Sequence, residues 1–140
     1  MKKSILFLII ASLFLSCSNS DSSSNNSNNC QTLHPPTWIQ GTWLKQNAPT
    51  AAGYKFTVDD VIENYNEISS SGGVSRKFQL DFYCTSNVHY TVTENINPTS
   101  YFLEINWGGI VTYNFTKISD TTIELVNDND PVNATYYIKQ

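Results

Sequence analysis

From residue 38 to the end of the chain, apolar and polar residues alternate in short runs separated by turn-forming residues. Tyr101, Leu103 and Ile105, for example, occupy every second position, and polar residues such as Glu104 lie between them. Successive side chains of a β-strand point to opposite faces of the sheet, so this period of two predicts half-buried strands. No segment combines helical spacing over about ten residues with capping residues, so we expect little helix.

Turn signals divide this region into about eight strands. Gly72-Gly73 and Gly108-Gly109 are typical of tight turns. The segment Val74–Cys84 alternates strongly, which predicts an inner strand with Arg76 at a solvated rim. Short antiparallel strands avoid exposed edges by closing on themselves. The prediction is therefore an all-β fold, a single antiparallel up-and-down β-barrel, with a β-sandwich as the alternative.

The first expected strand contains the tripeptide Gly41-Thr42-Trp43. A Gly, one spacer and a Trp resemble the first-strand signature of lipocalin-like barrels, in which the Trp closes one barrel end. The resemblance covers roughly residues 38–140 and is to small lipocalin-like domain lipoproteins of Bacteroidota-type bacteria. In larger lipocalins a late Arg packs across the Trp, whereas the last strand here offers Lys139. The resemblance implies binding of a small apolar or amphipathic ligand in the cell envelope; the alternative is a packed barrel that acts as a protein–protein interaction module.

The N-terminus has the organisation of an exported bacterial lipoprotein. Two lysines precede an apolar run, Ile5–Leu15, which is too short to span a membrane comfortably. The segment Leu13–Cys17 resembles a lipobox, in which the chain is cut before the Cys and the sulfur acquires a diacylglycerol. We therefore expect a signal peptide at 1–16, acylation of Cys17 with palmitate-type chains, and attachment to the outer membrane. Ser18-Asn19-Ser20 resembles an outer-membrane sorting signal, and Asp21 stands without the acidic run typical of surface-exported lipoproteins, which favours the periplasmic face over the cell surface.

Residues 17–29 form the expected tether between the anchor and a folded domain at 30–140. After the Cys the tether contains only Ser, Asn and one Asp, so it has nothing apolar to bury and is expected to stay disordered. Its root-mean-square reach is roughly 20 Å. Removal of Lys2 and Lys3 changes the formal net charge from −4 to −6. We therefore expect a membrane-anchored monomer that does not bind nucleic acid or anionic lipid surfaces.

With Cys17 acylated, Cys30 and Cys84 are left as an even pair in an exported protein. A disulfide between them is the favoured interpretation, because the compartment is oxidising. The alternative is a zinc site, in which His34 and His89 would complete a tetrahedral ligand set. The expected strand alternation sends Cys84 and His89 to opposite faces, which disfavours zinc.

Residues that commonly carry catalysis occur here without a recognisable arrangement. His89 lies on the polar face of an expected strand, which predicts an exposed side chain. Asp59, Asp60 and Glu63 cluster without the spacing of a calcium loop, which predicts a solvated turn. No Gly-x-Ser-x-Gly, His-Glu-x-x-His or phosphate-binding motif occurs in the sequence. We therefore expect no enzymatic activity, no cofactor and no bound metal.

Aromatic residues are enriched, with 3 Trp, 8 Tyr and 7 Phe. Most of them lie on the face of the expected strands that is turned to the core. Tyrosine combines an apolar ring with a polar tip, which suits the mouth of a site for amphipathic molecules. The candidate ligand-binding residues are Tyr54, Tyr90, Tyr101, Tyr113 and Tyr136. Asp120-Thr121-Thr122 also resembles an O-glycosylation site, which makes Thr121 a candidate for modification.

Overall fold

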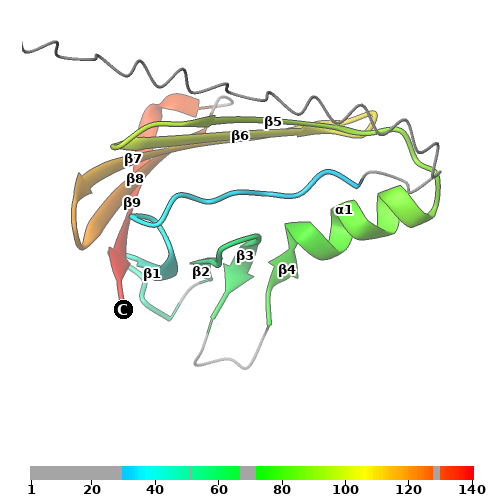
Figure 1. The fold of residues 1–140 in the computed structure, drawn as a ribbon. Helices are drawn as coiled ribbons and strands as arrows, with labels where there is room; N and C mark the ends of the chain where they lie inside the picture. The colour runs from blue at the N-terminus through cyan, green and yellow to red at the C-terminus, as the bar shows by residue number, and fades with distance from the viewer. Residues whose placement is uncertain (1–29, 51, 67–71, 128–129) are drawn as a thin grey trace, which may run out of the picture.

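The computed structural model describes residues 30–50, 52–66, 72–127 and 130–140. The predicted signal peptide, the acylated Cys17 and the tether lie outside the described residues. Within the described ranges the chain forms nine strands and one helix (Figure 1). In chain order these are β1 (Gly41–Lys45), β2 (Gly53–Phe56), β3 (Val61–Tyr65), β4 (Val74–Ser75), α1 (Arg76–Thr85), β5 (Thr91–Ile96), β6 (Ser100–Asn106), β7 (Ile110–Ser119), β8 (Thr122–Asn127) and β9 (Asp130–Lys139).

All nine strands belong to one sheet, with the order β4-β3-β2-β1-β9-β8-β7-β6-β5 and antiparallel pairing throughout. Two meanders, β1–β4 and β5–β9, are joined by the pairing of β1 with β9, where Trp43 lies opposite Lys139. The sheet curls so that β5 and β6 lie over β1–β4, and the segment before β1 runs between them (Figure 1).

The curled sheet is a half-barrel that is open between its two edge strands, β4 and β5. Helix α1 follows β4 directly and leads toward β5, so it lies at the open side of the half-barrel (Figure 1). The prediction of an all-β, antiparallel, barrel-like fold is confirmed. Because the described strands form one curled sheet, the architecture is a half-barrel rather than two separate sheets packed as a β-sandwich.

The core lies on the concave side of the sheet. Tyr101, Leu103 and Ile105 of β6 are fully buried, as the alternation predicts, and Phe115 of β7 and Trp43 of β1 are buried beside them. Each buried aromatic side chain removes roughly 150–250 Å² from water. The aromatic residues therefore supply a large part of the apolar area that holds the two meanders together.

The structure corrects the prediction for Val74–Cys84, which forms the two-residue strand β4 and then helix α1 instead of one long strand. In a helix, positions four apart share a face, whereas positions two apart lie on nearly opposite faces. A run with an apolar residue at every second position therefore splits into two helical faces. The inner set is Arg76, Leu80 and Cys84, and the outer set is Val74, Phe78 and Phe82.

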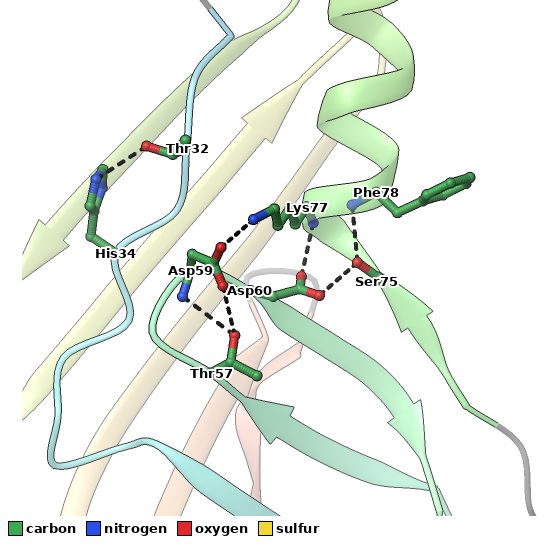
Figure 2. A network of polar contacts seen from close by, with 8 residues as sticks. All are labelled: Thr32, His34, Thr57, Asp59, Asp60, Ser75, Lys77 and Phe78. Atoms are coloured by element: carbon green, nitrogen blue, oxygen red, sulfur yellow. Dashed lines mark hydrogen bonds and ion pairs between the residues drawn. The ribbon is translucent and has the colours of Figure 1, made fainter.

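Capping interactions at the first turn explain why this run is helical. The Ser75 hydroxyl accepts a hydrogen bond from the Phe78 backbone N–H at 3.0 Å and donates one to Asp60 at 2.6 Å. Asp60 also accepts from the Lys77 backbone N–H at 2.9 Å (Figure 2). The first turn of a helix has unsatisfied N–H groups and a partial positive charge, so a hydroxyl and a carboxylate there stabilise α1.

Cys30 and Cys84 form a disulfide, which confirms the predicted pairing. Cys84 lies in the last turns of α1 and not on a strand, so the bridge ties the first described residue to the C-terminal half of the helix. The chain after Cys30 then lies against β5, where the Gln31 side chain accepts from the Val92 backbone N–H at 2.9 Å. This segment partly covers the β5 edge of the sheet.

On β9, Ala134, Tyr136 and Ile138 share one face of the strand and Tyr137 lies on the other. Tyr136 is 41% exposed and Tyr137 is buried opposite Ile123 of β8. Both faces of this strand carry apolar residues, so the alternation alone does not decide which face of the strand is turned to the core.

Candidate binding groove on helix α1

An apolar groove of about 660 Å³ lies along α1 and β4, at the open side of the half-barrel. Phe78 and Phe82 of α1 and Val74 of β4 supply its apolar wall, and they are 74%, 57% and 46% exposed, respectively. Figure 2 shows the Phe78 ring projecting away from the capping network at the helix start. The groove is lined by Gly73, Val74, Ser75, Phe78, Gln79, Phe82 and Tyr83.

Two polar side chains of α1 lie beside the apolar wall. The Gln79 side-chain N–H donates to the Tyr83 hydroxyl at 2.6 Å, and the Gln79 oxygen accepts from Arg76 at 2.6 Å. The Tyr83 ring packs at 6.0 Å from Tyr90 and 5.8 Å from Trp107, measured between ring centroids. The described lining residues carry no charged side chain. A groove with apolar walls and a few fixed polar groups is the usual form of a site for amphipathic molecules.

A buried polar network holds α1 in place behind the groove. Arg76 of α1 pairs with Glu63 of β3 and donates to the Tyr113 hydroxyl of β7 at 2.9 and 2.6 Å. That hydroxyl donates in turn to the second oxygen of Glu63 at 2.5 Å. Burial raises the pKa of Tyr113 above 10.0, and the hydrogen bond to Glu63 acts in the same direction. The network joins both meanders of the sheet through the helix.

The sequence analysis placed Arg76 at a solvated rim, which is wrong, because Arg76 is only 7% exposed. Its spacing of four from Leu80 and eight from Cys84 fits one face of a helix as well as one face of a strand, so the spacing alone does not identify its position. The solvated turn expected for the acidic cluster is also wrong for Asp60, which is 8% exposed and caps α1.

The structure brings three of the candidate tyrosines together around Phe115 in the core and places the other two elsewhere. Tyr101 and Tyr113 are buried in the core, and Tyr54 packs in the core edge-to-face with Phe115. Tyr90 accepts from the Gln31 backbone N–H at 3.1 Å, and Tyr136 lies on the outer face of β9, so the five do not form one site.

The Gly41-Thr42-Trp43 element forms the start of β1, and the Trp43 side chain is fully buried. The Trp43 ring N–H donates to the Ile39 carbonyl at 2.6 Å, and the Lys139 ammonium lies 5.2 Å from the Trp43 ring centroid. The Lys139 side chain thus lies over one face of the Trp43 ring. Gly41 has φ +126°, which side-chain-bearing residues rarely adopt, and a Cβ there would lie 3.0 Å from the Lys139 side chain.

The remaining candidate residues are exposed or take part in ion pairs. His89 is exposed, and His34 pairs with Glu94 at 3.0 Å. Asp59 pairs with Lys77, which holds the pKa of that carboxyl below its ordinary value. In the part of the chain that the structure describes, no group of three or more His, Cys, Asp or Glu is arranged to hold a metal ion. Thr121 is exposed in the β7–β8 turn.

No protein-family model, no curated protein and no solved structure matches this chain. None of the helical residues that the structure describes forms a helix long and apolar enough to cross a membrane. The groove on α1 is therefore interpreted from its own geometry.

Proposed function

We propose that this protein is a lipid-anchored envelope protein that binds the apolar part of a small amphipathic ligand in the groove on α1. The single observation that carries the proposal is the exposed outer set of the helix, Phe78 and Phe82 above all, beside the polar pair Gln79 and Tyr83. A contiguous exposed apolar patch on a small protein commonly marks a surface that contacts a ligand, a partner protein or a membrane.

The groove, and not the barrel centre, is the proposed binding site. The concave side is filled by Trp43, Tyr101 and Phe115, each less than 2% exposed. Coverage of Phe78 and Phe82 would remove roughly 260 Å² from water, at about 200 Å² per ring. At about 25 cal/mol per Å² this contributes about 6 kcal/mol before the entropy lost on binding is subtracted.

The anchor in this proposal is Cys17, for the sequence reasons given above. Two or three acyl chains on one Cys make a stable membrane attachment, since each buried methylene contributes about 0.8 kcal/mol. We place the protein on the periplasmic face of the outer membrane.

A second candidate function, a protein–protein interaction module, is favoured by the short edge strand β4. Val74 of β4 is 46% exposed and borders the groove, and β4 is an edge of the described sheet. An extended partner segment could add to this edge and cover the two Phe rings.

Native mass spectrometry of the full-length protein purified from its own membrane tests the proposal. We expect a chain that begins at Cys17, carries acyl chains, has lost two protons to the disulfide, and binds added dodecanoic acid with one molecule per chain. The Phe78→Asn and Phe82→Asn variants should lose this binding. Ile118→Asn is the matched control, since Ile118 is an exposed apolar residue on β7. An acylated, disulfide-bonded protein that takes up no dodecanoic acid would refute ligand binding and favour the interaction module.

A further inference from the structure

We infer that the groove on α1 faces the bilayer that carries the anchor, and that its occupant is the acyl chain of a membrane phospholipid. The inference deepens the proposed function and rests on it. It follows from where the tether joins the domain, from the chemistry of the groove, and from the distribution of charge around it.

The tether joins the domain at the groove-bearing helix. The disulfide fixes Cys30 to Cys84, two positions after Phe82. Cys17 precedes Cys30 by 13 positions, so the acylated residue lies within roughly 20 Å of the bridge on average. Helix α1 has 10 residues and is about 15 Å long at 1.5 Å per residue. Both Phe rings can therefore reach the lipid surface while the anchor is inserted.

The disulfide makes this proximity directional. Without the bridge, the chain after the tether would first contact the domain through the β5-facing residues near Gln31. With it, the anchoring force acts on the C-terminal half of α1, next to the exposed rings of Phe78 and Phe82. A tethered surface contact needs little affinity of its own, because the tether keeps the effective concentration of bilayer high.

The groove has the chemistry of a surface that contacts neutral lipid. Its wall is apolar and aromatic, its polar groups are the uncharged Gln79 and Tyr83, and its described lining carries no charge. The charged side chains on α1 are Arg76, which donates to Gln79 and is paired with Glu63, Lys77, which is paired with Asp59, and Asp81. A mature chain of net charge −6 does not favour anionic lipid. The expected contact is therefore apolar insertion among the chains of a zwitterionic phospholipid.

Quenching by brominated lipid tests the inference. The full-length acylated protein is reconstituted into phosphatidylcholine vesicles with brominated acyl chains, which quench nearby tryptophan emission. The Phe78→Trp and Phe82→Trp variants each place a reporter in the groove, and Ile118→Trp is the matched control on β7. The emission of the parent protein is subtracted from that of each variant. We expect the tryptophans at positions 78 and 82 to lose most of the remaining emission in brominated vesicles and the tryptophan at position 118 to retain its emission.

The outcomes separate the inference from the proposed function. Groove reporters that are quenched no more than Ile118→Trp, in a protein that still binds dodecanoic acid, would overturn bilayer contact and leave a groove for a soluble amphiphile. A protein that shows neither groove quenching nor binding of dodecanoic acid would overturn both the bilayer contact and the proposed ligand binding. A Cys30→Ser/Cys84→Ser variant that stays anchored should show less groove quenching, because the tether then no longer pulls on α1; unchanged quenching there would refute the directional role of the disulfide.

Discussion

Replacing Glu63 by leucine would leave the guanidinium of Arg76 on the concave side of the sheet without its carboxylate partner. The Arg76 side chain is 8% exposed and that of Glu63 is 20% exposed. Removing one partner of a buried ion pair destabilises a protein by about 3–5 kcal/mol, because the other charge stays desolvated. Since Glu63 retains some solvent access, we expect a loss of about 3 kcal/mol, which for a domain of this size lowers the Tm by roughly 12 °C.

The double variant distinguishes ion pairing from mere loss of packing. Arg76→Met alone removes the ion pair with Glu63 and the hydrogen bonds to Tyr113 and Gln79. Because Glu63 is 20% exposed and keeps the hydrogen bond from Tyr113, we expect a loss of about 2 kcal/mol. In Glu63→Leu/Arg76→Met no buried charge is left, and an apolar pair of similar volume replaces the ions. The double variant should therefore lose about 2 kcal/mol rather than about 5, a coupling of roughly 3 kcal/mol.

Urea unfolding of the full-length protein in a mild detergent, followed by tryptophan fluorescence, measures these differences. Asp120→Asn is the matched control, because Asp120 pairs with Lys117 but its side chain is 91% exposed. We expect the control to lie within about 0.5 kcal/mol of the parent. The reasoning is refuted if Glu63→Leu is as stable as Asp120→Asn, or if the effects of the two core substitutions simply add.

Two further predictions concern the core and the bridge. Burial raises the folded-state pKa of both Tyr101 and Tyr113 above 10.0. Their contribution to stability is therefore fully present below about pH 10 and falls as the pH rises further. Tm measured from pH 7 to 11 should decline at the alkaline end, and a flat profile would contradict this. Reduction of the Cys30–Cys84 disulfide, which joins residues 54 positions apart, should destabilise the fold by about 4 kcal/mol in the chain-entropy model. Thermal unfolding with and without dithiothreitol measures the shift in Tm. Equal Tm values would show that the bridge does not constrain the unfolded chain.

The β-strands were predictable because one physical rule governs them. On β6 and β7 the buried residues follow the period of two, and Gly108-Gly109 separates the two strands as expected. The disulfide was predictable because Cys30 and Cys84 are the two cysteines left once Cys17 is taken as the acylated residue of an exported protein. Strand β9 was not, because apolar residues occur on both of its parities and the pairing with β8, which places Tyr137 opposite Ile123, is a long-range interaction.

The polar network behind the groove could not be predicted from local pattern. Glu63, Arg76 and Tyr113 lie on β3, α1 and β7, and their meeting depends on how the sheet curls. The sequence analysis also had no reason to separate Asp60 from its exposed neighbour Asp59. Only the position of the first turn of α1, whose N–H groups need an acceptor, makes Asp60 a capping residue.

Helix α1 shows why one alternating pattern has two physical meanings. As a strand, Val74–Cys84 would bury Phe78, Leu80 and Phe82 together on one face. As a helix it buries Leu80 and leaves both Phe rings in water, which is unfavourable by several kcal/mol for an isolated domain. Capping and the buried ion pair favour the helix at its first turn, and the disulfide constrains its other end. The exposed rings are then the consequence of a helix that the rest of the fold requires, and a bilayer or ligand that covers them would remove the unfavourable exposure that helix formation creates.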